Sequence, residues 1–188
     1  MKPVVIDTNV LLVANGNHLA VSAKCRMACI TALLDCKKSG VVVLDSAFLI
    51  LMEYQRRTQP NQPKGPGDVF LKWLQQNKAN RHRVHYVVIN EVSPATFREF
   101  PNAKLQAKFD PADRKFVAVA SAHPGKPTIL QGADSKWVGW WKQLLDEGIK
   151  VAFLCPDDVQ RFYSEKFPGG VNSPLPLRAR ESRQLKAL

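Results

Sequence analysis

The sequence predicts an α/β protein, a three-layer α/β/α sandwich with a central parallel sheet of four or five strands. Short apolar runs rich in β-branched residues alternate along the chain with longer stretches whose apolar residues recur at helical spacing. Strands separated by helices favour a parallel sheet that is covered on both faces. With 188 residues, 45% of them hydrophobic, the chain is large enough to bury a core within one domain.

The predicted strands are short apolar runs bounded by turn residues. In chain order they cover residues 3–6, 41–44, 84–89, 128–130 and 149–154. Predicted helices separate these runs, at residues 22–38, from residue 45 onward, around residues 69–74, and at 110–122, 135–147 and 157–167. Ser22 is the expected N-cap of the first helix and Gly40 its stop, and Asp45 or Ser46 should cap the second.

The domain is predicted to span residues 1–167. A basic tail that contains proline and glycine follows at residues 168–188, and we expect it to be mobile. Residues 57–68, which include three prolines and two glycines, are predicted to form a loop. No apolar run is long enough to cross a bilayer and no signal-peptide pattern opens the chain, so a cytoplasmic protein with no membrane association is expected.

The four cysteines contain no C-x-x-C pair and no histidine at zinc-ligand spacing. Cys25, Cys29 and Cys36 fall on one face of the first predicted helix, and Cys155 follows the last predicted strand. Buried free thiols are therefore favoured over a metal site.

The charge of the chain is strongly basic. The formal net charge is +11 and the isoelectric point about 9.7, which indicates a polyanionic partner such as nucleic acid. Between residues 54 and 86, seven basic residues stand against one acidic residue. Tyr54, Trp73 and Tyr86 lie among them and could stack on bases. A solvated basic surface without a partner is the plainer alternative.

Four acidic residues occupy positions where a ligand site would form. Asp7 ends the first strand in "VVIDTNVLL", and Asp134 follows the fourth strand in "TILQGADSKW". Glu53 is the one acidic residue of an otherwise mostly apolar helical stretch, and Asp113 opens another helix. Ligands collect at the carboxyl ends of parallel strands. Converging carboxylates there would repel one another unless Mg²⁺ or Mn²⁺, which prefer hard oxygen ligands, bind between them.

Each acidic residue also has a purely structural interpretation. Asp7 could form an Asx-turn, and Asp134 could cap the helix that follows it. Asp110, Pro111 and Asp113 together suit the positively polarised start of a helix. Glu53 would have no special role if its helix face were solvated. The set of four, rather than any single member, favours a metal site.

The order and spacing of these residues resemble the PIN-domain nucleases, small metal-dependent enzymes that cleave RNA and include the toxins of toxin–antitoxin pairs. The resemblance runs from Lys2 to about Asp158, and "VVIDTNVLL" is its most specific segment. It implies that Asp7, Glu53, Asp113 and Asp134 are the catalytic metal ligands for Mg²⁺ or Mn²⁺. It further implies a 5′-phosphate product, and it makes an antitoxin or a homodimer a possible partnership.

The chain departs from the family pattern after the fourth strand. Lys136 stands where a second aspartate is frequent, Gly132 where threonine is usual, and Trp137 where phenylalanine is usual. Lys136 could displace a second metal ion or point away from the site, and Asp110 could supply a further ligand or a cap.

The sequence therefore predicts a metal-dependent endoribonuclease. The residues expected to hold RNA phosphates are Arg56, Arg57, Lys64, Arg114 and Lys136. Two alternatives remain: a nucleic-acid-binding scaffold whose metal site has degenerated, and a related 5′-nuclease that acts on DNA. A phosphatase of the haloacid-dehalogenase type is disfavoured, because it needs a second aspartate where Asn9 stands.

Overall fold

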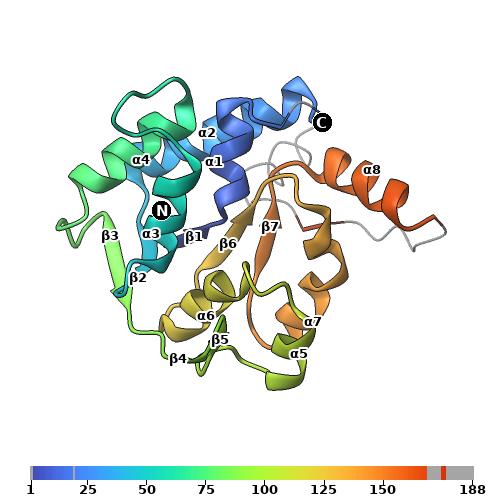
Figure 1. The fold of residues 1–188 in the computed structure, drawn as a ribbon. Coiled ribbons are helices and arrows are strands. Elements are labelled where there is room, and N and C mark those ends of the chain that lie inside the picture. The colour runs from blue at the N-terminus through green and yellow to red at the C-terminus, as the bar shows by residue number, and fades with distance from the viewer. Residues whose placement is uncertain (1, 19, 169–174, 177–188) are drawn as a thin grey trace.

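The computed structural model describes residues 2–18, 20–168 and 175–176, and it has a five-stranded sheet at its centre (Figure 1). In spatial order the strands are β3 (Val84–Val87), β2 (Val42–Asp45), β1 (Val4–Ile6), β6 (Thr128–Gln131) and β7 (Val151–Phe153). Every neighbouring pair is parallel. The predicted parallel sheet is thus confirmed, with strand ends that differ by at most two residues from the predicted ones.

Helices flank the sheet (Figure 1). One group, in which each helix packs against the other two, consists of α1 (Thr8–Asn15), α2 (Ala23–Ser39) and α4 (Pro66–Gln76). Helix α6 (Arg114–Ala122) lies against β1, β2 and β6, and α3 (Leu49–Arg57) contacts both α1 and α6. The arrangement is compatible with a three-layer sandwich.

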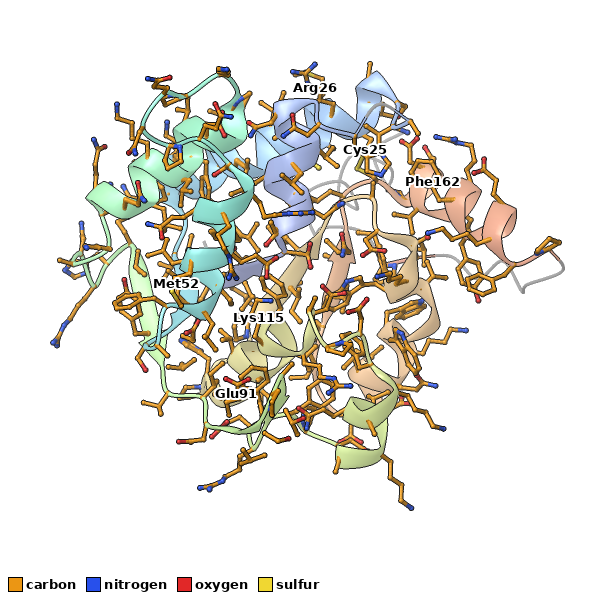
Figure 2. The ribbon with its side chains drawn as sticks, viewed as in Figure 1. Cys25, Arg26, Met52, Glu91, Lys115 and Phe162 are labelled. Atoms are coloured by element: carbon orange, nitrogen blue, oxygen red, sulfur yellow. A yellow bond between two sulfur atoms is a disulfide. The ribbon has the colours of Figure 1, made fainter. Side chains whose placement is uncertain are left out.

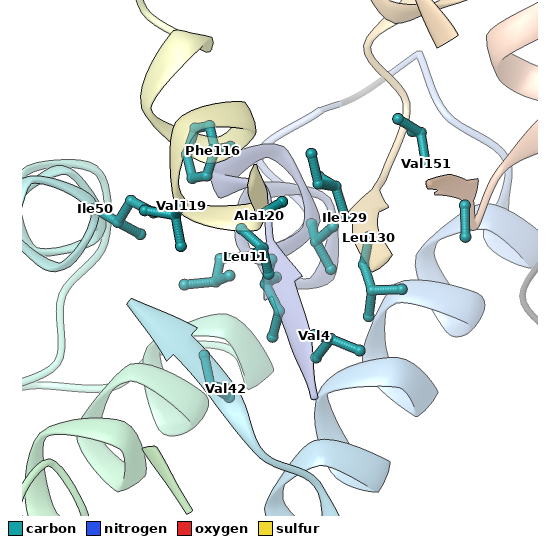
Figure 3. Close-up of a cluster of buried hydrophobic side chains, with 14 of the residues drawn as sticks. Val4, Leu11, Val42, Ile50, Phe116, Val119, Ala120, Ile129, Leu130 and Val151 are labelled. Carbon is teal, nitrogen blue, oxygen red and sulfur yellow. The ribbon is translucent and has the colours of Figure 1, made fainter. Parts of the chain in front are cut away.

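The core forms where strands and helices meet (Figure 3). Val4, Val42 and Ile129 lie on three neighbouring strands, while Leu11 of α1 and Phe116 of α6 come from helices. All five side chains are buried. Full burial of each such side chain stabilises the fold by about 1.5–3 kcal/mol before entropy is counted, so these contacts fix the sheet on which the acidic residues are mounted.

Several elements were not predicted. The first is α1, in which five consecutive apolar residues, 10–14, show no amphipathic periodicity because α2 and α4 cover the helix. The others are the antiparallel pair β4 (Glu91–Ser93) and β5 (Thr96–Phe97), and α5 (Ala103–Lys108). The helix predicted at 135–147 is two elements, η1 (Ser135–Gly139) and α7 (Trp141–Asp146).

Two predicted helices, at 22–38 and 157–167, are right to within one residue at each end, whereas the helices predicted to begin at residues 45 and 110 begin at Leu49 and Arg114. Ser22 is the N-cap of α2, its side chain accepting from the Cys25 N–H, and Gly40 ends that helix. The buried Asp45 carboxylate accepts from the backbone N–H groups of Leu49 (2.7 Å) and Ile50 (3.0 Å), so it caps the start of α3. The last helix, α8 (Pro156–Lys166), begins one residue before the predicted start.

Most of the tail at 168–188 lies outside the described residues. Within the described part, Leu175 is buried, and the Pro176 carbonyl accepts from the Phe153 N–H at 2.9 Å. These two residues lie against β7, so the prediction of a mobile tail is wrong for them.

The cysteine prediction is only partly right. The four side chains are buried, as expected, but Cys25 and Cys155 form a disulfide, and Cys29 and Cys36 remain as thiols. Cys25 and Cys155 lie 130 positions apart, and the fold brings the start of α8 against α2. Disulfides are typical of oxidising compartments, which does not favour the cytoplasmic location expected from the sequence; that location stays a prediction.

Candidate functional site

Asp7 lies at the carboxyl end of β1, the central strand of the sheet. Its own N–H donates to the Leu130 carbonyl of β6 at 3.0 Å, which extends the β1–β6 pairing by one residue. As the N-cap of α1, its Oδ1 accepts from the Asn9 N–H at 2.7 Å. The residue is only 4% exposed. The Asx-turn interpretation is thus correct locally, but it accounts for one carboxylate oxygen only.

Burial raises the pKa of Asp7 well above its ordinary value, and the charge of Asp113 raises it further. The Asn9 N–H works in the opposite direction, while Asp134 and Glu53 add to the increase. The four carboxylates predicted to form a site therefore lie near enough to act on one another electrostatically. Charge repulsion within the group favours either a shared proton or a bound cation.

Glu53 is positioned by a contact between α3 and β1. The buried Tyr54 hydroxyl donates to the Ile6 carbonyl, which fixes α3 against the end of the central strand. The Glu53 carboxylate accepts from the Thr8 hydroxyl at 2.6 Å through Oε1. Its Oε2 lies 2.5 Å from Lys115 Nζ. Glu53 thus faces the end of β1, and its side chain is only 22% exposed.

Lys115 is the site residue that the sequence pattern did not reveal. Its side chain is 11% exposed, its ammonium also donates to the Ala112 carbonyl, and it lies 4.7 Å from the centre of the Phe116 ring. Figure 2 labels it near the middle of the molecule, on α6. A lysine within the apolar stretch "RKFVAVASA" was the available signal, because lysine is rarely buried unless it is paired.

Asp113 stands at the N-cap of α6, yet its side chain makes no capping hydrogen bond. Asp110 Oδ1 accepts from the Ala112 N–H at 3.0 Å in the turn before α6, so neither aspartate caps the helix through its side chain. Burial raises the pKa of Asp113 to about 7, the charges of Asp134 and Asp110 raise it as well, and two lysines partly oppose them. A bound cation would relieve this repulsion.

Asp134 is the N-cap of η1 and accepts from the Lys136 N–H at 2.9 Å. The loop before it is fixed by Asn9, whose Oδ1 accepts from the Ala133 N–H at 2.6 Å. Asp7, Asp113 and Asp134 therefore each stand at the N-terminus of a helix or helical turn. Backbone N–H groups and the helix dipole stabilise negative charge at such positions.

Lys136 points toward Asp110 rather than toward Asp134. The ammonium and the Asp110 carboxylate form an ion pair, which lowers the pKa of Asp110 and raises that of Lys136. Lys115 and Lys136 together bring two ammonium groups to a cluster that contains Asp110 and the four predicted carboxylates. The negative charge that remains suits a divalent cation.

The carboxylate oxygens of the acidic cluster are ligands that Mg²⁺ and Mn²⁺ prefer. They do not form a closely spaced group of three ligand atoms. Within the described ranges, the one group of three or more His, Cys, Asp or Glu ligand atoms that all lie within 4.8 Å of one another is Cys25, Cys29 and Cys155. Mg²⁺ commonly binds through one or two carboxylates and keeps several water molecules. A Mg²⁺ site of that kind does not require three ligand atoms packed closely together.

Gly132 replaces the threonine expected from the resemblance, and the structure supplies a reason. A Cβ atom at this position would lie 2.5 Å from Asn9 Oδ1, the oxygen that holds the Ala133 N–H. Only glycine lets the loop before Asp134 approach Asn9 this closely.

We expect Gly132→Ala to displace the Asn9 side chain and to lower the free energy of unfolding by about 1–3 kcal/mol, the usual range for removal of a hydrogen bond together with strained packing. Urea unfolding monitored by circular dichroism would measure this change. Gly139→Ala is the matched control, because no atom lies within 4 Å of a Cβ placed there. Equal stability of the two variants would show that the loop tolerates a side chain at residue 132.

The predicted phosphate-binding residues divide into two groups. Arg56, Arg57 and Lys64 have exposed side chains at the end of α3 and in the loop before α4. Arg114 instead donates to the carbonyls of Phe109, Ala95 and Ala107, so most of its donors hold the local fold together. These bonds disfavour a phosphate-binding role for Arg114, and Lys136 is already paired.

The three aromatic residues predicted to stack on bases differ in how exposed their side chains are. Tyr54 is fully buried, so its expected role in base stacking is wrong. Trp73 is partly covered and packs against Phe70, with ring centres 5.5 Å apart. Tyr86 is 37% exposed and remains accessible to a base.

Comparisons of the chain with protein-family models, with curated proteins and with solved structures gave no match. Among the described residues, no helix combines the length and hydropathy that a membrane span requires. Inference about function therefore depends on the geometry and charge of the acidic cluster.

Proposed function

We propose that this protein is a divalent-metal-dependent endoribonuclease of the PIN type. The observation that carries the proposal is the group formed by Asp7, Glu53, Asp113 and Asp134, whose charges act on the buried Asp7 at the carboxyl end of the central strand. A net charge of +11 makes a polyanionic substrate the natural partner of such a site.

In this proposal Asp7, Asp113 and Asp134 hold Mg²⁺ or Mn²⁺. When bound, such an ion lowers the pKa of a coordinated water and stabilises the negative charge that develops on a phosphodiester. The protein supplies the positions of the ligands: Asn9 fixes one oxygen of Asp7 and the loop that carries Asp134, and Thr8 orients Glu53. The second oxygen of Asp7 remains for the ion.

Lys115 and Glu53 form a mostly buried ion pair beside these ligands. The ammonium orients the Glu53 carboxylate, and it adds positive charge at the place where an RNA phosphate would approach. Glu53 can accept a proton from a water molecule bound between it and the aspartates. Its role is thus general base or outer-sphere ligand.

The second candidate function is a nucleic-acid-binding scaffold without catalysis. The two ammonium groups favour it, since Lys115 pairs with one acidic residue and Lys136 with another, and both partly neutralise the cluster without any metal. Cleavage of DNA rather than RNA is the third possibility. The antitoxin and the homodimer expected from the resemblance stay predictions.

The decisive experiment measures cleavage of 5′-labelled single-stranded RNA and DNA by the purified full chain, with Mn²⁺, with Mg²⁺ and with excess chelator. The proposal expects RNA fragments that carry 5′-phosphates, formed with either metal and absent in chelator. Equal cleavage in chelator would contradict the metal-dependent mechanism. Tight RNA binding without cleavage under any metal would establish the scaffold, and preferential cleavage of DNA the 5′-nuclease alternative.

We expect the triple change Arg56→Gln, Arg57→Gln and Lys64→Gln to weaken RNA binding. The slope of log affinity against log salt should fall by about one for each phosphate that these side chains no longer neutralise. Fluorescence anisotropy across a salt series would measure the slope. The control replaces three other exposed basic residues, Arg98, Lys104 and Lys108, in the same way. If both triples reduce the slope equally, the effect reflects net charge and not a defined RNA path.

A further inference from the structure

A cavity of about 470 Å³ adjoins the acidic cluster on the side of α8. Asn9 and Asp134 form part of its wall, and His18 and Phe162 form another part. Because Asp134 belongs both to this wall and to the proposed metal site, a group bound in the cavity would lie directly beside the reacting phosphate. The volume is within the range of small-molecule sites.

The aromatic part of the wall is held in place by contacts between α8 and the start of α2. The rings of His18 and Phe162 lie with their centres 5.4 Å apart, and the Arg161 guanidinium lies 4.4 Å from the centre of the Phe162 ring. The Asp158 carboxylate accepts from both the hydroxyl and the N–H of Ser22, at 2.6 and 3.1 Å. Phe162, which Figure 2 labels on α8, is therefore a positioned ring.

Three polar side chains of the same wall can form further hydrogen bonds with a bound group. Ser135 is 3% exposed, and among the described residues no partner is found for its hydroxyl. Asn9 uses its side-chain oxygen on Ala133, while its Nδ2 has no partner within the same residues. The Glu165 carboxylate also lines the cavity and could accept further hydrogen bonds.

The charges of the wall nearly balance. Two carboxylates, Asp134 and Glu165, line the cavity beside Lys166, and Arg161 Nη1 lies 3.5 Å from Glu165 Oε1. A wall of this kind has no excess positive charge to hold a phosphate, whereas a neutral heterocycle could lie against Phe162 and direct its polar edge at Ser135 and Glu165. Carboxylates accept from exocyclic amino groups, so cytosine and adenine suit this edge better than uracil does.

We propose that this cavity binds the nucleobase next to the scissile phosphate, with a preference for bases that carry an exocyclic amino group. Phe162 supplies the stacking surface, and Ser135, Asn9 and Glu165 contact the edge of the base. The inference rests on the proposed RNA substrate, but it concerns recognition and is independent of whether the strand is cut.

The test measures binding of fluorescein-labelled twelve-nucleotide homopolymers of cytosine, adenine and uracil by the full chain in an Asp7→Asn background, which prevents turnover. We expect the cytosine and adenine polymers to bind several-fold more tightly than the uracil polymer. Phe162→Leu, which keeps an apolar side chain but removes the aromatic face, should weaken binding of the first two by about tenfold, as for loss of one stacked base. Ser135→Ala should reduce the preference between bases.

Phe167→Leu is the matched control, since Phe167 lies at the end of the same helix and outside the cavity wall. Thermal unfolding of each variant checks that α8 still packs. Equal affinity of the Phe162→Leu and Phe167→Leu proteins for all three polymers would overturn the proposal, even if the wild-type protein cleaves RNA. If Phe162→Leu loses base-selective binding but the wild-type protein never cleaves RNA, the base pocket is supported and the nuclease activity is rejected.

Discussion

We expect Asp7→Asn to abolish Mn²⁺-dependent RNA cleavage while the metal-free protein becomes more stable. The amide keeps the size of the side chain and can still accept from the Asn9 N–H, but it removes a negative charge that is buried among three other carboxylates. For a chain of this size the midpoint of thermal unfolding should rise by roughly 2–4 °C per 1 kcal/mol gained.

The measurements are single-turnover cleavage of labelled RNA and thermal unfolding in chelator. Asp146→Asn is the control, because Asp146 is exposed on α7 and its replacement removes the same formal charge. Cleavage by the Asp7→Asn protein at the wild-type rate would exclude Asp7 as a metal ligand. Loss of cleavage together with lower stability would indicate that Asp7 acts as a cap of α1 alone.

The second large effect is a pH dependence that arises from Asp113. Its pKa of about 7 in the folded protein exceeds the ordinary value of 3.8. Between these two values the folded state binds more protons than the unfolded state does, so stability in chelator should fall as the pH rises from about 4 to 7. Each unit of pKa corresponds to about 1.4 kcal/mol, and allowing for partial solvent screening we expect a loss of about 1–3 kcal/mol from Asp113.

Asp113→Asn should therefore reduce the loss of stability with rising pH, leaving the part that comes from the raised pKa of Asp7, and make the chelated protein more stable than the wild type above pH 7. Mn²⁺ should reverse the loss in the wild type, because the ion binds the ionised carboxylates. Urea unfolding at pH 5 and pH 8, with chelator and with Mn²⁺, separates the two effects.

Asp110→Asn provides a control of opposite sign. The hydrogen bond from Lys136 is the largest cause of the lowered pKa of Asp110, so its carboxylate contributes stability above its ordinary pKa, and that stability is lost as the pH falls. If the free energy of unfolding depends on pH in the Asp113→Asn protein as it does in the wild type, the proton that the folded state binds between pH 4 and 7 is not on Asp113.

The strands and the order of the acidic residues could be predicted from the sequence because both are local signals. Buried parallel strands consist of short β-branched runs, and Asp7 and Asp134 directly follow two of them. Since parallel strands end at one edge, two carboxylates at strand ends must lie near each other. The likeness of "VVIDTNVLL" to PIN domains gave a function to expect, and that function remains a proposal.

The sequence pattern predicted helices least well where other helices bury a helix on all sides, or where a helix is interrupted. Helix α1 lacks an amphipathic pattern because its neighbours bury both sides, and η1 and α7 are separate elements where one helix was predicted. The tertiary context decided these two elements.

The sequence by itself determined the sheet, the positive charge and the positions of the carboxylates along the chain. Only the tertiary structure decided that Lys115 pairs with Glu53, that Cys25 joins Cys155, and that α8 closes a cavity beside Asp134. Each of these contacts joins side chains far apart in the sequence. Periodicity reports which face of an element is buried, whereas a pairing depends on how separate elements pack, and that is set by the shape of the whole core.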